Sequence, residues 1–253
     1  MARRTGVHPP RALGGEQVEG RHAVRELLAA ATRPAKVVYV SRDAEPAPVL
    51  DEIAALAGPI LRVVPIEKLA ALARTDTHQG VVATARPLLP VSVDDLLAVD
   101  GCFVLALEGV TDPHNLGAVL RSAAAFGVTG VVVPNRRATL VTPAVAKAAA
   151  GAIEHVPIAL TSGIPAALER ARRAQVWTVG LAADGGTEID AITVADESIV
   201  LVMGAEGHGL SRLSTQRCDV VARIPIADHV ESLNVSVAAA IALHEIARRR
   251  RSR

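Results

Sequence analysis

Short β-branched runs alternate with amphipathic helical stretches over the first third of the chain. In the helical stretches apolar residues recur at helical spacing, whereas in the runs between them they follow one another. The predicted elements are an amphipathic helix entered by a loop within VEGRHAVRELLAA, strands at Lys36–Ser41, Leu61–Val64 and Gly80–Ala85, and helices at Val49–Leu56 and Ile66–Arg74. This alternation predicts a small α/β domain.

The remainder of the chain carries strand-like runs that are apolar along their whole length. The predicted strands are Cys102–Leu107, Gly130–Val133, Val176–Leu181, Ser198–Met203 and Val220–Ile226, and the predicted helices are Leu116–Phe126, Val141–Ala150, Ile164–Arg173 and Val235–Ala247. Such strands are typical of a parallel sheet covered by helices on both faces, and ligands bind such sheets at the carboxyl ends of the strands. The pattern alone favours an unknotted doubly wound sheet, because true knots are nearly absent from proteins.

Four segments follow from these patterns. Residues 1–15 carry Gly, Pro and Arg without periodicity, and we expect a disordered tail there. Residues 16–86 form the small α/β domain, residues 87–95 with their prolines are expected to be a linker, and residues 96–253 form the second domain.

Composition narrows the range of functions. Half of the residues are hydrophobic but only 2% are aromatic, which argues against nucleic-acid modules that stack bases on aromatic platforms. The net charge of +1 excludes a globally basic coat and leaves room for a local basic patch. Cys102 and Cys218 lie far apart without a CxxC motif, and the eight histidines show no metal-ligand spacing, so we expect neither a disulfide scaffold nor a metal site. No apolar run approaches the length of a membrane span, and we expect a cytoplasmic protein.

Chemistry concentrates in three turns, of which the first is EGVTDPHNLGAVLR, Glu108 to Arg121. Asp112 and Pro113 indicate a turn, and Asn115 stands where a helix N-cap belongs. Arg121 follows on an otherwise apolar helix, where a buried guanidinium is costly without an anionic partner. Gly117 lies one turn earlier and is expected to leave space beside it. A structural salt bridge is the alternative to a ligand.

The second turn is GAEGHGL, Gly204 to Leu210, directly after a predicted strand. Its glycines allow the backbone to approach a ligand closely. The spacing G-x-x-G-x-G differs from the G-x-G-x-x-G of dinucleotide-binding loops. Glu206 is either a ligand carboxylate or the partner of a basic residue across an interface.

The third turn runs from Asp228 to Asn234, between a predicted strand and the predicted helix Val235–Ala247. Ser232 or Asn234 is expected to cap that helix. A strand, a polar loop and a helix N-terminus together form a common place for a small ligand. Taken alone, the segment favours a capped helix that only packs.

In combination the turns are far more specific. The segments DPHNLGAVLRSAAAFG, LVMGAEGHGL and IPIADHVESLNVSVAAAIALHE, in this order, closely resemble the three motifs of SpoU-type (TrmH-like) RNA ribose 2′-O-methyltransferases. VEGRHAVRELL and THQGVVATA resemble the small N-terminal substrate-binding domain of members that methylate a guanosine of 23S rRNA. Two departures stand out: Glu108-Gly109 replaces the more frequent Asp-Gly, and Asp228-His229 replaces Gly-x.

The resemblance implies an α/β chain with a trefoil-knotted C-terminal methyltransferase domain, which binds S-adenosylmethionine in its knot loops. Those loops correspond to Gly204–Gly207, Ile224–Ile226 and Ser232–Val235. Main-chain groups of Gly204, Ile224 and Leu233 are the implied cofactor contacts, with flanking positions that complete the set: Gly207, Pro225, Ile226 and Ser232. The family also implies a homodimer joined through the knot region, including the helix Val235–Ala247.

The resemblance further implies Arg121 as the catalytic residue, with Asn115, Asn234 and Glu206 beside it. A guanidinium with a pKa above about 12 is a poor base, so we interpret Arg121 as an electrostatic clamp on the alkoxide or on the target phosphate. Three alternatives stay open: the same chemistry on tRNA or on another rRNA nucleotide, as in antibiotic-resistance enzymes; a Rossmann-type enzyme; and a non-catalytic RNA-binding protein of this fold.

Overall fold

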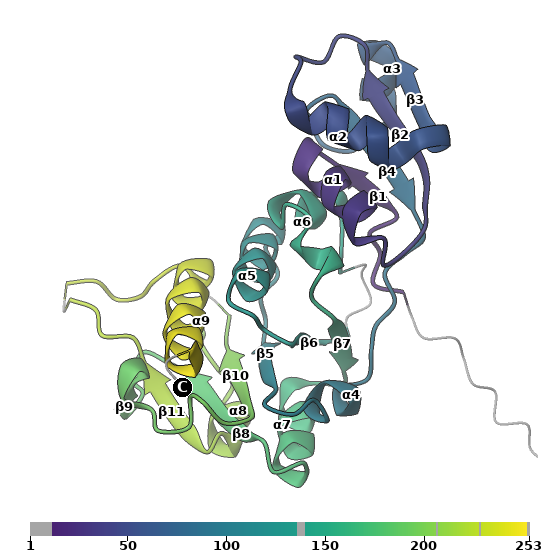
Figure 1. Ribbon diagram of the computed structural model, residues 1–253. Helices are drawn as coiled ribbons and strands as arrows, with labels where there is room; N and C mark the ends of the chain where they lie inside the picture. The colour runs from purple at the N-terminus through teal and green to yellow at the C-terminus, as the bar shows by residue number, and fades with distance from the viewer. Residues whose placement is uncertain (1–11, 136–139, 206, 228, 252–253) are drawn as a thin grey trace, which may run out of the picture.

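The protein folds into two α/β domains (Figure 1), as seen in a computed structural model that describes residues 12–135, 140–205, 207–227 and 229–251. None of the helices in this described part combines the length and the apolar character that a membrane crossing needs. Cys102 is buried, Cys218 is partly buried, and both thiols are free.

The N-terminal domain is a four-stranded sheet with helices packed against it. Its elements are β1 (Gln17–Glu19), α1 (Arg21–Ala30), β2 (Ala35–Ser41), α2 (Pro48–Ala57), the 3-10 turn η1 (Gly58–Ile60), β3 (Leu61–Val64), α3 (Ile66–Leu72) and β4 (Val81–Ala85). The strand order is β1-β4-β2-β3, with only β2 and β3 parallel among its pairs. Val24 and Leu27 of α1 and Ile53 of α2 are buried against the sheet. The predicted helices and strands are confirmed, and β1 is an addition, because three residues are too few to produce a pattern.

Residues 12–15, the end of the segment predicted to be a disordered tail, make ordered contacts with the rest of the chain. Leu13 is 2% exposed. Its N–H donates to the Leu88 carbonyl at 2.9 Å, and its carbonyl accepts from Val141 at 2.8 Å. Gly15 also donates to the Val141 carbonyl, at 2.8 Å. Residues 12–15 are therefore held between the two domains by backbone pairing, which a periodicity argument cannot detect. Residues 1–11 lie outside the described residues.

The C-terminal domain is built on a seven-stranded sheet in the order β7-β6-β5-β10-β8-β11-β9. Its strands are β5 (Phe103–Leu107), β6 (Gly130–Pro134), β7 (Ile158–Thr161), β8 (Trp177–Leu181), β9 (Thr187–Glu188), β10 (Ile199–Met203) and β11 (Val220–Arg223). Every pairing described in this sheet is parallel. The parallel α/β core is thus confirmed, whereas the knot stays a prediction.

Helices cover both faces of this sheet, as predicted. They are α4 (Val93–Leu97), α5 (Pro113–Ala125), α6 (Pro143–Ala148), α7 (Ile164–Arg173), α8 (Arg212–Arg217) and α9 (Val235–Arg251), with 3-10 turns η2 (Ala152–Glu154) and η3 (Ile189–Ala191). One core cluster joins α5, α6 and α9 to the sheet, and a second joins α4 and α7 to the other face. The first is dominated by Leu, Ile, Val and Ala, in keeping with the scarcity of aromatic residues.

Several boundaries differ from the predictions. The elements β7, β9, α4 and α8 were not predicted because they are short, and the start of α4 places residues 93–95 in a helix rather than in the expected linker. The strand β11 ends at Arg223 rather than Ile226, and Pro225 has no N–H to continue the ladder. The helix α6 begins only at Pro143, where Thr142 caps it.

A buried ion pair fixes the N-terminal domain to the C-terminal one. Arg33, just beyond α1, donates to both carboxylate oxygens of Glu154 in η2, at 2.7 and 3.0 Å. The Arg33 side chain is 6% exposed and that of Glu154 is 0% exposed. Arg33 also donates to the carbonyls of Gly15 and Arg86, at the two ends of the N-terminal domain. The Arg33 guanidinium therefore contacts both ends of the N-terminal domain and also the C-terminal domain.

Candidate functional site

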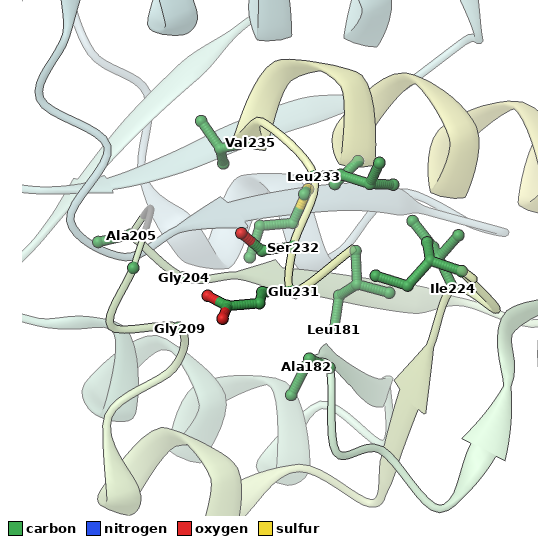
Figure 2. A pocket seen from close by; sticks show the side chains of 15 residues that line it. Leu181, Ala182, Gly204, Ala205, Gly209, Ile224, Glu231, Ser232, Leu233 and Val235 are labelled. Atoms are coloured by element: carbon green, nitrogen blue, oxygen red, sulfur yellow. The ribbon is translucent and has the colours of Figure 1, made fainter. Parts of the chain in front are cut away.

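A pocket of about 370 Å³ opens at the carboxyl ends of β8, β10 and β11 (Figure 2). The segment that leads into α9 closes its remaining side. The lining residues are Leu181, Ala182, Ala183, Met203, Gly204, Ala205, Gly207, Gly209, Ile224, Ile226, Glu231, Ser232, Leu233, Val235 and Ala238. The second and third of the predicted turns thus meet at one edge of the sheet, as the parallel topology led us to expect.

The glycine-rich turn after β10 is shaped by its own backbone. Ala205 and Gly209 exchange two main-chain hydrogen bonds, at 2.9 and 3.2 Å. This ring brings the Gly209 carbonyl so close to Gly204 that a Cβ on Gly204 would lie 2.0 Å from it. Gly207 and Gly209 have φ values of +79° and +60°, which side-chain-bearing residues rarely adopt. The glycines are therefore required by the turn itself, before any ligand is considered.

The chain after β11 forms the apolar side of the pocket. Ile224 and Ile226 line it, whereas Pro225 between them is exposed and is not among the lining residues. Arg223 donates to the Gly185 carbonyl at 3.0 Å and to Glu188 at 3.1 Å. These hydrogen bonds from Arg223 of β11 hold the loop after β8 beside the pocket, and they thereby fix the position of Ala182 and Ala183.

Two asparagines join the first and third predicted turns. Asn234 donates from its amide to the side-chain oxygen of Asn115 at 3.0 Å. The side-chain oxygen of Asn234 accepts from the N–H of Ser236 at 2.9 Å, so Asn234 caps α9 as one of the two predicted candidates. The start of α5 is thereby linked to the start of α9, next to the lining residues Ser232, Leu233 and Val235.

The N-cap of α5 is Asp112, not Asn115 as predicted. One carboxylate oxygen of Asp112 accepts from the N–H groups of Asn115 at 3.0 Å and His114 at 2.6 Å. Both backbone hydrogen bonds lower the pKa of the Asp112 carboxyl below its usual range, and the bond from Asn115 has the larger effect. Pro113 occupies the first helical position, which its fixed φ favours. With the cap supplied by Asp112, the Asn115 side chain is available to Asn234.

Arg121 lies on the same helix but does not line this pocket. It is exposed and lies in a separate groove between the domains. The predicted cost of burying its guanidinium does not arise. Gly117 does not leave space beside it either, because a Cβ on Gly117 would lie 2.4 Å from the Ala148 Cβ. That glycine serves the close packing of α5 on α6.

Glu231 is the only charged side chain among the described lining residues. Figure 2 shows it between the Gly204–Gly209 turn and the end of β8, with its carboxylate directed toward the cavity. Sequence reasoning missed Glu231, and it missed Leu181 and Ala182 as well. The rule that ligands bind at carboxyl strand ends would have found the end of β8. Glu206 and Asp228 lie outside the described residues, so the role predicted for Glu206 has no structural account.

The described residues contain no group of three or more His, Cys, Asp or Glu side chains that could hold a metal ion. The pocket instead offers apolar side chains, main-chain groups, the Ser232 hydroxyl and one carboxylate. Such a lining suits an organic molecule that combines an apolar ring with a cationic group.

Comparisons with known proteins give matches over both domains. The family described as "SpoU rRNA Methylase family" matches residues 102–244, and the one described as "RNA 2'-O ribose methyltransferase substrate binding" matches residues 17–91. The chain is 42% identical over 245 residues to an uncharacterized tRNA/rRNA methyltransferase of Mycolicibacterium vanbaalenii, with 94% of this chain and 77% of that protein covered. It is 38% identical over 241 residues to a putative TrmH family tRNA/rRNA methyltransferase of Staphylococcus aureus, with 92% and 96% covered.

The fold has close counterparts among solved structures. An AdoMet-bound rRNA methyltransferase from Sinorhizobium meliloti superimposes with a TM-score of 0.73 and 26% identity, covering 92% of this chain and 87% of that one. Both domains therefore take part in the likeness.

Proposed function

Because the chain belongs to the SpoU rRNA methylase family and is an RNA ribose 2′-O-methyltransferase, we propose that it methylates a guanosine of 23S rRNA, with S-adenosylmethionine bound in the pocket at the ends of β8, β10 and β11. The observation that carries this proposal is the convergence of two family motifs on that one pocket. Six of the seven positions predicted for the cofactor line it: Gly204, Gly207, Ile224, Ile226, Ser232 and Leu233.

The pocket fits the cofactor chemically. Leu181, Met203 and Ile224 offer apolar surface to an adenine ring, while the main chain of Gly204 and Leu233 can pair with its polar edges. The carboxylate of Glu231 faces a ligand that carries a sulfonium and an ammonium group. When bound, S-adenosylmethionine supplies an electrophilic methyl group. The exposed Pro225 contributes by fixing the backbone between Ile224 and Ile226.

The two linked asparagines are proposed to position the acceptor ribose. Asn115 and Asn234 sit where the starts of α5 and α9 meet, beside Ser232 and Leu233 of the pocket. Alignment of the hydroxyl with the methyl group and its leaving sulfur is the main demand of an in-line displacement. A side-chain amide held by a second amide meets this demand with little reorganisation.

Arg121 is proposed to bind an RNA phosphate. It follows Asn115 by six residues, which is about 9 Å along the helix axis and on another side of α5. This placement outside the cofactor pocket favours a clamp on the substrate backbone over one on the reacting oxygen. The guanidinium stays protonated, so the proton of the 2′-hydroxyl passes to water or to a phosphate oxygen.

The choice of a ribosomal substrate rests on the N-terminal domain. Its family description is substrate binding, and the buried pair of Arg33 and Glu154 holds it against the catalytic domain. The alternative acceptors are tRNA and a different rRNA nucleotide, as in antibiotic-resistance enzymes, since the two bacterial relatives are named for both tRNA and rRNA.

A homodimer through α9 is part of the proposal. Val237 and Ile241 of this helix are 47% and 39% exposed, and Ile226 and Val230, in the preceding segment, are 36% and 38% exposed. Val237 and Ile241 are one turn apart on the same face of the helix, and exposed apolar side chains grouped in this way are typical of an interface between subunits.

The experiment is methyl transfer from labelled S-adenosylmethionine to 23S rRNA, 16S rRNA and tRNA transcripts, with the product mapped by nuclease digestion. We expect 2′-O-methylguanosine in 23S rRNA. Methylation of tRNA alone would overturn the assignment of the substrate and keep the chemistry. If neither the transcripts nor ribosomal precursor particles accept a methyl group, the function itself is overturned.

A further inference from the structure

A second groove, of about 460 Å³, lies where the two domains meet. Its walls come from α1 of the N-terminal domain and from α5 and the α6–η2 segment of the C-terminal domain, which Figure 1 shows close together. The lining residues are His22, Glu26, Arg121, Ala124, Ala125, Ala149, Ala150, Ala152 and His155. Five of these nine are alanines, here called the alanine floor, and the other four side chains are polar: His22, Glu26, Arg121 and His155.

The groove is preformed by contacts between the domains. Beside it, Arg33 and Glu154 form their buried pair, and Lys147 of α6 binds Thr77 of the N-terminal domain. Across the groove itself, His155 and Glu26 are paired at 2.8 Å. A Cβ on Gly151 would lie 2.3 Å from the Glu26 Cβ, so α1 and η2 touch closely. No rearrangement is needed to create this surface.

The charge of the groove is set by Arg121. Glu26 is already paired with His155 and with Arg25. Arg25 also forms an ion pair with Glu52, at 2.6 Å. Among the residues that the structure describes, no acceptor or carboxylate is paired with the Arg121 guanidinium. The groove therefore presents the exposed Arg121 guanidinium, which has no partner among the described residues, together with five alanines, and His22 of α1 is exposed as well.

We propose that this groove binds a nucleotide of the RNA substrate that neighbours the methylated one. Arg121 holds its phosphate, the alanine floor contacts its ribose and base, and His22 offers a hydrogen-bonding edge from the N-terminal domain. The proposal rests on the proposed function and deepens it: the N-terminal domain contributes to recognition at the nucleotide next to the reaction, in addition to any binding farther along the RNA. Single-stranded RNA is the form that fits, because an unpaired base can turn out of the strand and enter the groove between the two domains.

Filling the groove tests the proposal. Ala125 is exposed at the last position of α5, and Ala125→Leu adds a side chain over the floor in a residue type that favours helices. The matched control is Ala98→Leu, an exposed position just after α4, on the other face of the sheet. Steady-state kinetics would be measured with the RNA that accepts a methyl group, alongside calorimetric binding of S-adenosylmethionine and a thermal melt.

We expect Ala125→Leu to raise KM for RNA about tenfold with unchanged cofactor affinity, and Ala98→Leu to behave as the wild type. His22→Ala is expected to raise KM about threefold on the same principle. If Ala125→Leu melts like the control and keeps the wild-type KM, the groove proposal is wrong and the proposed function stands. If wild-type protein methylates no RNA, both fall together.

Discussion

The pocket at the ends of β8, β10 and β11 and the seam between the two domains are built in opposite ways. The pocket consists of main chain and plain side chains from turns that follow β8, β10 and β11, with one charged residue among its described lining. The seam depends on single charged side chains from distant parts of the chain, such as Arg33 and Glu154, 121 positions apart. A pocket of the first kind tolerates side-chain change but not a change of backbone, whereas the seam is sensitive to the loss of one group.

The largest effect on stability is expected at the seam. Glu154→Ala leaves the Arg33 guanidinium buried without its anion, a situation that costs about 3–5 kcal/mol. We expect a lower denaturation midpoint and faster proteolysis between residues 86 and 92. Chemical denaturation with limited proteolysis provides the measurement.

Glu169→Ala is the matched control, because Glu169 pairs with Arg172 and Arg173 on the surface of α7. Exposed pairs contribute little, so this variant should melt like the wild type. Equal stability of Glu154→Ala and Glu169→Ala would show that the buried pair does not hold the domains together.

The largest effect on catalysis is expected at Arg121. Arg121→Ala should lower kcat/KM for the RNA by about 10- to 100-fold, because a hydrogen bond to a charged group contributes about 1.5–3 kcal/mol. Arg121→Lys should retain part of the activity, since it keeps the charge without the guanidinium fork. Single-turnover kinetics on the accepted RNA would measure both. Wild-type turnover in Arg121→Ala would remove this residue from the mechanism.

Asn234 offers a smaller and more selective test, because its two side-chain roles can be separated. Asn234→Ala removes the cap of α9 and should cost about 1 kcal/mol of stability. Asn234→Asp keeps an acceptor for the N–H of Ser236 but loses the donor to Asn115. We therefore expect near-wild-type stability and reduced turnover in Asn234→Asp. Full activity in this variant would mean that the Asn115 link is not needed for positioning.

The smallest expected effect is the pH dependence of the Glu26 contact in the groove. The hydrogen bond from His155 is the main cause that lowers the pKa of Glu26 from its ordinary value of 4.5. A carboxylate whose pKa is lower in the folded chain stabilises the fold above the ordinary value, and this contribution is lost as the pH falls through the lowered pKa. The stability difference between wild type and Glu26→Gln should therefore shrink on acidification below 4.5. A stability difference that stays constant as the pH falls below 4.5 would contradict a lowered pKa of Glu26.

The sequence was a good guide to the fold and to the pocket. Long apolar strands and amphipathic helices predicted both domains, and the turns at Gly204 and Ser232 line one pocket at the carboxyl edge of the sheet, where the predicted parallel topology put them. What the sequence did not reveal depends on contacts between remote residues. Leu13 shows no periodicity, yet it is buried by pairing with Leu88 and Val141.

The errors around Arg121 have the same origin. A helical spacing places Gly117 on a face with Arg121, but it does not tell whether a neighbouring helix fills that face, and Ala148 does. The error over the cap was different and local: Asp112 and Asn115 are both good caps, and Pro113, which favours the first helical position, decides for Asp112 from the sequence alone. The groove between the domains could not be predicted, because its walls come from α1, α5 and η2.

The most direct test of the account is calorimetric binding of S-adenosylmethionine to wild type, Gly204→Ala and Arg121→Ala. A Cβ on Gly204 would lie 2.0 Å from the Gly209 carbonyl and must displace the turn, so Gly204→Ala should weaken binding by about a hundredfold or more. Arg121→Ala, altered outside the pocket, should bind like the wild type. Unchanged binding in Gly204→Ala, or lost binding in Arg121→Ala, would contradict the assignment of the pocket to the cofactor and of Arg121 to the RNA.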